Sequence, residues 1–155
     1  MIDIIEIIDE TQKMNITDEI LHKLPNWFGI ESSIQEYMKD VRDKIFYAAI
    51  FHGKVIGFIC LRHVNPFTAE LFLVGILEEF HRQGIGCMLI GAAEEYLTKN
   101  EYKFFMVKTV GDSSDDLYYA RTRAFYRNVG FFPLDEFKEI WNEQNPCLIM
   151  VKTLS

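Results

Sequence analysis

The sequence predicts one α/β (α+β) domain with a mixed, mostly antiparallel central sheet of about seven strands and helices on both faces. Three observations lead to this fold class. The chain has 155 residues, a common domain size, and no repeat or Pro/Gly-rich linker divides it. Its first half holds apolar runs joined by short turns, which are typical of hairpins. In its second half strands alternate with helices, which favours a mixed sheet. We therefore expect residues 1–155 to form a single domain.

Seven apolar runs have the length and composition of β-strands. They are residues 2–8, 46–51, 55–64, 70–77, 102–110, 130–134 and 146–154. His52, Gly53 and Lys54 separate the second run from the third and are typical of a hairpin turn. Asn65 and Pro66 then turn the chain into the fourth run. These turns predict consecutive antiparallel strands.

Four segments show the spacing or the end signals of helices. They are residues 17–24, 31–43, 86–97 and 116–128. Thr17 and Glu31 are suitable first residues for the two early helices. Leu89 and Leu97 belong to an apolar stripe at helical spacing in the third. Gly130 follows the last segment and is a typical helix terminator.

The charge and the cysteines limit the classes of function. The net charge is -7, and no cluster of Lys or Arg provides the basic face of a general nucleic-acid binder. An acidic surface is compatible with an amine substrate and is equally common in soluble cytosolic proteins. Cys60, Cys87 and Cys147 are scattered among apolar residues, which favours reduced thiols in the cytoplasm. The acidic opening MIDIIEIIDE is unlike a signal peptide, and we expect no membrane span and no metal ion.

A glycine pair lies where an apolar strand changes into a helix, within LFLVGILEEFHRQGIGCMLIGAAEEYL at residues 71–97. Gly84 and Gly86 could form a tight turn only, or they could let the backbone approach an anion at the helix N-terminus. The dinucleotide fingerprint requires a third glycine where this chain has Leu89. The P-loop requires Lys and Ser/Thr where this chain has Cys87 and Met88. Neither of these phosphate motifs fits.

Two segments resemble the GNAT superfamily of N-acetyltransferases. LVGILEEFHRQGIGCMLI is similar to the acetyl-CoA loop of that family, whose pattern is Gln/Arg-x-x-Gly-x-Gly/Ala. AFYRNVGFFPL, about 40 residues later, is similar to its Ala-Leu-Tyr-x-x-x-Gly-Phe segment. The order of predicted elements also matches over nearly the whole chain. Two departures stand out: His81 replaces the Gln/Arg, with the basic Arg82 beside it, and Tyr119 replaces an asparagine of the family.

The resemblance implies that acetyl-CoA is the co-substrate. The segment around the glycines would wrap the pyrophosphate, the preceding strand would offer backbone groups to the pantetheine arm, and Tyr119 would contact the coenzyme. These residues are Arg82, Gln83, Gly84, Ile85, Gly86 and Cys87 for the pyrophosphate, and Val74, Gly75 and Ile76 for the arm. In the family this strand diverges from the next one, and the arm enters the gap.

The same resemblance implies the catalytic residues of a direct transfer to a primary amine. Tyr126 matches the family tyrosine near the sulfur, and a phenol of pKa about 10 keeps its proton at neutral pH. Tyr119 lies seven residues earlier, on the same helix face. Glu70 stands where some members, histone acetyltransferases included, place a catalytic glutamate. Each could instead be a packing or surface residue, and His63 is an alternative base.

The acceptor site is expected, by the resemblance, between the early helices and the late hairpin. Trp27 and Phe28 are candidate substrate contacts there, although two aromatic residues between helices are also typical of a core. The acceptor itself is a small-molecule or peptide amine of unknown identity. Alternative functions are acyl transfer from a longer acyl-CoA, or coenzyme binding without turnover by a sensor or partner protein. The last strands could pair across an interface, so a homodimer is compatible with the sequence.

Overall fold

The computed structural model describes residues 1–155 and contains one sheet of seven strands in the order β1-β2-β3-β4-β5-β7-β6. The strands are β1 (Ile2–Glu6), β2 (Ile45–Phe51), β3 (Lys54–Asn65), β4 (Thr68–Ile76), β5 (Phe104–Val110), β6 (Phe132–Phe137) and β7 (Cys147–Thr153). All neighbouring pairs are antiparallel except β4 and β5, which are parallel. The predicted mixed, mostly antiparallel sheet is confirmed.

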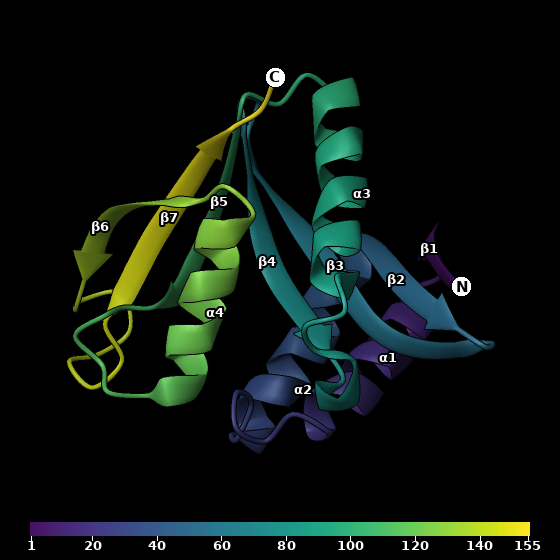
Figure 1. The fold of residues 1–155 in the computed structure, drawn as a ribbon, viewed down its shortest axis with the longest axis horizontal. Coiled ribbons are helices and arrows are strands. Elements are labelled where there is room, and N and C mark those ends of the chain that lie inside the picture. Colours follow the sequence, from purple (N-terminus) through teal and green to yellow (C-terminus); the bar gives the residue numbers. More distant parts are fainter.

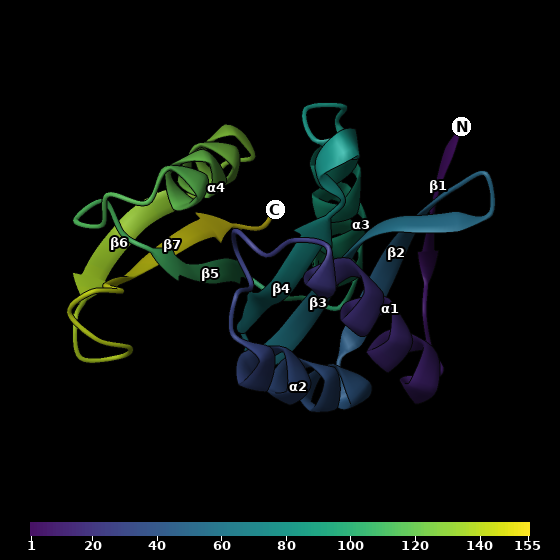
Figure 2. The same ribbon diagram turned by 90° about the horizontal axis from the view of Figure 1, so that it is seen from below.

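Helices cover both faces of this sheet, as predicted. They are α1 (Glu10–His22), α2 (Glu31–Asp40), α3 (Ile85–Lys99) and α4 (Leu117–Asn128), with short 3-10 turns η1 (Val41–Asp43) and η2 (Glu78–Phe80). Figure 2 shows α1 and α2 on one face, and α3 and α4 on the other. None of these helices combines the length and the apolar run that crossing a membrane requires.

The sheet opens between β4 and β5 (Figure 1). The two strands pair only over Thr68–Leu71 and Phe104–Val107, and then diverge. A register shift in the β3–β4 pairing leaves Phe72 without a partner, because Leu71 and Leu73 face consecutive residues of β3. Such a bulge bends a strand and increases its twist. The opening therefore begins next to a bulge.

The largest difference from the expected elements is the start of the first helix. Helix α1 begins at Glu10 rather than Thr17, because the side chain of Asp9 accepts a hydrogen bond of 2.9 Å from the Gln12 N–H. Thr17 is buried inside the helix and bonds the Lys13 carbonyl instead. The last helix ends at Asn128, and Gly130 has a φ of 102°, which agrees with its expected role as terminator.

The core on the α1 side of the sheet is aromatic and aliphatic. The rings of Phe46 and Phe58 are stacked with centroids 5.0 Å apart, and both side chains are fully buried. Ile20 and Leu21 of α1 are also fully buried and pack beneath β4. A Cβ atom on Gly75 would lie 3.0 Å from Ile20 and 3.2 Å from Phe58. The close approach that Gly75 permits is therefore that of α1 to the sheet.

Candidate functional site

The segment at the start of α3 contains a run of free backbone donors. The N–H groups from Arg82 to Cys87 have no acceptor, and the first helical bond is that of Met88 to the Gly84 carbonyl, at 3.1 Å. Arg82 and Gly84 have φ angles of 63° and 81°, and such left-handed residues turn consecutive N–H groups towards one point. With the positive end of the α3 dipole, this arrangement can bind an anion.

The two glycines of this segment have different surroundings. Gly84 is exposed, its positive φ favours glycine, and the position of a Cβ there is open. At Gly86 a Cβ would lie 2.6 Å from the ring of Phe125. Gly86 thus allows α4 to contact the first turn of α3, a role that the sequence did not reveal.

His81, the residue that departs from the family pattern, points back to the end of β4. Its Nε2 lies 2.6 Å from the carbonyl oxygen of Ile76; because a carbonyl only accepts, this nitrogen carries the proton. One backbone group of the predicted Val74–Ile76 contact set is therefore already bonded within the protein. The ring of His81 also meets that of Trp27 edge-on, with centroids 5.6 Å apart.

Trp27 joins the loop between α1 and α2 to helix α4. Its Nε1 donates to the Tyr118 carbonyl at 3.3 Å and to Thr122 Oγ1 at 3.2 Å. The Tyr119 hydroxyl donates in return to the Trp27 carbonyl at 2.9 Å. Trp27 thus lies between His81 of the α3 loop and the residues Tyr118 and Tyr119 of α4. No pattern of residue spacing in the sequence indicated this contact between Trp27 and α4.

Tyr126 lies on the inner face of α4 and is 5% exposed. Its ring packs against Phe125 and Phe131, with centroids 5.6 Å and 5.7 Å away. Burial, followed by the neighbouring phenols Tyr119 and Tyr37, raises the pKa of Tyr126 well above that of a free tyrosine. The hydroxyl therefore keeps its proton throughout the neutral range and can act as a hydrogen-bond donor.

Tyr37 of α2 was not singled out by its sequence pattern, yet it belongs to the site. Its ring meets Phe28 at 6.1 Å and Phe72 at 5.8 Å between centroids, both edge-on. We call Phe28, Tyr37 and Phe72 the aromatic row; it runs from the α1–α2 loop to the bulge of β4. Burial, then the charges of Asp40 and Glu70, raises the pKa of Tyr37. The candidate substrate contact Phe28 is thus joined through Tyr37 to Phe72 at the bulge of β4.

Glu70 is buried at the start of the opening and is held by two cations. Its side chain is 7% exposed, and its Oε1 accepts a bond of 2.6 Å from Arg62 Nε. Lys108 Nζ lies 3.8 Å from the other oxygen. Arg62 is the cross-strand partner of Glu70, so strand register creates this pair. Glu70 is therefore not the free strand-end carboxylate that the alternative interpretation describes.

His63, the alternative base, faces the other way. It follows Arg62 in β3, and consecutive strand residues point to opposite faces. Its Nδ1 lies 2.6 Å from the Tyr102 hydroxyl, in a cavity of about 110 Å³ under the end of α3. A larger cavity of about 260 Å³, lined by Arg123 and Arg127, lies between α4 and β6–β7 and includes none of the predicted site residues.

One buried and two half-buried phenols, Tyr126, Tyr37 and Tyr119, predict a loss of stability in alkali. Burial raises the pKa of Tyr119 to about 12, and those of Tyr37 and Tyr126 are also raised. The pKa of each of these phenols is higher in the folded protein than in the unfolded chain. Their contribution to stability is therefore fully present below about pH 10 and is lost as pH rises towards 12. We expect the urea midpoint to fall between pH 9 and 11, and tyrosinate absorbance at pH 11 to increase further when the protein unfolds. Equal midpoints at both values would contradict this prediction.

Comparisons with known proteins agree with this geometry. A family model described as the acetyltransferase (GNAT) family matches residues 15–131. An uncharacterized N-acetyltransferase of Chlorobaculum tepidum is 25% identical over 136 residues, covering 81% of this chain and 79% of that protein. A GNAT-family protein from Desulfovibrio desulfuricans has a TM-score of 0.85 at 15% identity over 100% of both chains. A GNAT family acetyltransferase from Elizabethkingia anophelis, solved with acetyl-CoA bound, has a TM-score of 0.74 at 19% identity and covers 99% of this chain and 98% of its own. The structural likeness establishes a shared fold.

Proposed function

Because the chain belongs to the acetyltransferase (GNAT) family, we propose that it transfers the acetyl group of acetyl-CoA to a primary amine in a ternary complex. The observation that carries this proposal is the run of free N–H groups from Arg82 to Cys87 at the open side of the β4–β5 gap. Such a run suits the pyrophosphate of the coenzyme. The acetyl-CoA bound to the relative from Elizabethkingia anophelis supports the choice of ligand.

The overall charge does not prevent the binding of an anionic coenzyme. The protein carries -7, but salt screens distant charges beyond roughly 8–10 Å. The helix-end donors act at hydrogen-bond distance, and Arg82 beside them adds an exposed cation. Val74 and Gly75 lie on the stretch of β4 that is not paired with β5, so their backbone groups can meet the pantetheine arm.

Acetyl transfer here proceeds by direct attack of the amine on the thioester. The nitrogen bonds to the carbonyl carbon, the carbon–sulfur bond breaks, the thiolate departs with the electron pair, and the nitrogen loses a proton. A covalent intermediate on Cys60 is disfavoured, because Cys60 is fully buried and burial raises its pKa to about 12. Cys147 is also buried with a raised pKa. Tyr126 would stabilise the departing sulfur, and Glu70 would order a water that accepts the proton.

A matched pair of substitutions at Gly84 tests the coenzyme site. Asp and Asn both tolerate a positive φ and have the same shape, and the site has room for either. We expect Gly84→Asp to weaken acetyl-CoA binding about tenfold more than Gly84→Asn, because only the carboxylate repels pyrophosphate. Titration calorimetry measures both. Gly86→Val is unsuitable, since its side chain would displace Phe125.

The wild type provides the reference for this comparison. Acetyl-CoA at a hundredfold excess over its Kd should stabilise it by about 2.7 kcal/mol. Equal affinities of the two Gly84 variants for acetyl-CoA would contradict the assignment of this loop to the pyrophosphate. Release of free CoA across a panel of primary amines then tests turnover. Coenzyme binding without release from any amine would favour a sensor, and faster release from longer acyl donors would favour another acyltransferase.

A further inference from the structure

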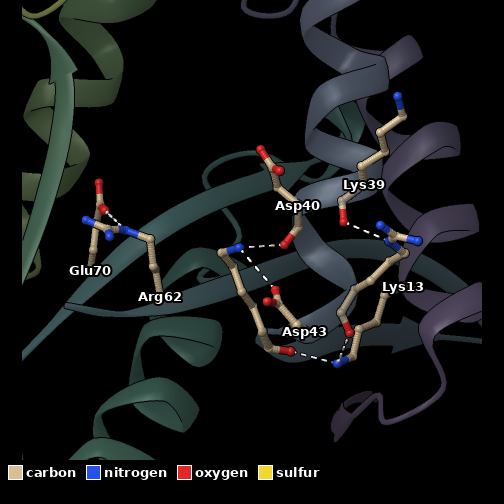
Figure 3. Close-up of polar contacts among 8 residues, drawn as sticks. Lys13, Lys39, Asp40, Asp43, Arg62 and Glu70 are labelled. Carbon is tan, nitrogen blue, oxygen red and sulfur yellow. Dashed lines mark hydrogen bonds and ion pairs between the residues drawn. The ribbon is translucent and has the colours of Figure 1, made fainter. Parts of the chain in front are cut away.

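Two cations and one carboxylate meet where β4 and β5 begin to diverge. Arg62, Glu70 and Lys108 come from β3, β4 and β5 and point to the same face of the sheet. Leu71 and Val107 form the last pair of the parallel ladder, so Lys108 is the first residue of β5 beyond it. Figure 3 shows Arg62 and Glu70 joined above the strands. The cluster therefore lies at the inner end of the gap that would hold the thioester.

This cluster has a surplus positive charge and free donors. Arg62 uses only Nε in its bond to Glu70, so both terminal nitrogens of the guanidinium have no partner. Lys108 donates no hydrogen bond, and its contact with Glu70 is at 3.8 Å. The side chains of Arg62 and Lys108 are 38% and 32% exposed, whereas that of Glu70 is 7% exposed. Because the one carboxylate offsets only one of the two cations, the cluster has one unit of surplus positive charge on the partly exposed side chains of Arg62 and Lys108.

No carboxylate other than Glu70 forms an ion pair with Arg62 or Lys108. Lys44 lies over the ring of Phe72 and bonds the Asp40 carbonyl and the Asp43 carboxylate. Lys13 donates to two backbone carbonyls (Figure 3). The Asp43 carboxylate is therefore paired with Lys44, whereas Asp40 gives Lys44 only its backbone carbonyl. Neither acid pairs with Arg62 or Lys108, which are the cations with donors to spare.

We propose that the acceptor amine carries an anionic group, a carboxylate or a phosphate, which Arg62 and Lys108 bind while the amine faces the thioester. This inference rests on the proposed acetyl transfer. Only the neutral amine attacks, and an amine with a carboxylate then has a net charge of -1, which complements the surplus. A guanidinium fork suits such an anion. A polycationic acceptor would instead be repelled by the surplus positive charge of the cluster.

Matched acceptors and one variant test the inference. Each amino acid is compared with its α-amide, and an amino sugar phosphate with the unphosphorylated sugar, by CoA release. We expect kcat/KM to favour the anionic member at least tenfold. Lys108→Met should reduce that preference by roughly 10–100-fold, the size associated with a charge-assisted hydrogen bond. Lys54→Met, at an exposed hairpin position, should retain the preference. The pair of acceptors with the larger preference in kcat/KM shows whether the site binds a carboxylate or a phosphate.

A binding measurement separates this inference from catalysis. With CoA saturating, the N-acetylated form of the preferred anionic acceptor should raise the Tm of the wild type more than its neutral counterpart does, and Lys108→Met should abolish the difference. Equal turnover of anionic and neutral amines, or an equal loss for both in Lys108→Met, would overturn the inference and leave acetyl transfer intact. Absence of CoA release with every amine would overturn the proposed function, and absence of a difference in Tm would overturn the inference itself.

Discussion

Replacing Tyr126 by phenylalanine is expected to lower kcat about a hundredfold while the affinity for acetyl-CoA stays nearly unchanged. The hydroxyl would be needed only as the sulfur departs, so its loss affects the transition state and not the bound ground state. Because the pKa of Tyr126 is raised, full proton transfer to a thiolate of pKa about 8.5 is uphill. The role we propose for it is therefore hydrogen-bond donation, and one such donor is typically worth about 10²–10³ in rate.

Stopped-flow or steady-state release of CoA measures this effect, and calorimetry measures the affinity. The side chain of Tyr126 forms no hydrogen bond within the protein, and phenylalanine preserves its contacts with Phe125 and Phe131. The fold should thus tolerate the change. Tyr118→Phe, on the same helix, is the matched control. It also removes one hydroxyl, and phenylalanine keeps the ring that meets Trp27. A Tyr126 variant within threefold of wild type would make Tyr126 a packing residue.

Glu70→Gln is expected to lower kcat/KM at pH 7 by about 10–10³-fold, with a deficit that shrinks as pH rises. An alkylamine has a pKa near 10.4 and an ordinary carboxyl group about 4.3, so direct proton abstraction is steeply uphill. A carboxylate that orders a water can instead relay the proton as the amine attacks. Near the pKa of the amine, free amine no longer needs this help. The wild-type kcat/KM should rise with pH through an apparent pKa between about 6 and 9.

The ion pairs of Glu70 make a folding control necessary. The glutamine of the variant could still accept the Arg62 bond, but it would leave two cations without a counter-charge. The Tm of the variant is therefore measured beside its rate. Glu78→Gln, on an exposed turn, is the matched control and should keep the wild-type profile. A wild-type rate for Glu70→Gln at pH 7 would mean that bulk solvent, and not a water ordered by Glu70, accepts the proton.

The sequence by itself determined the fold class, the order of the elements and the place of the predicted coenzyme loop. Hydrophobic periodicity and turn chemistry are local properties, so the apolar stripe with Leu89 and Leu97 was sufficient to predict α3. Gly84 could be recognised because a left-handed residue between strand and helix favours glycine. Helix α1 was predicted to start too late, since Asp9 was not recognised as its N-cap.

Only the tertiary structure decided which distant residues meet. Arg62, Glu70 and Lys108 come together through the register of three strands, and a shift of one residue would turn each side chain to the other face. Phe125 meets Gly86, and Trp27 meets Tyr118, because helices and a loop far apart in the chain pack across the opening. Such contacts depend on strand pairing and helix packing together, and no local pattern records them.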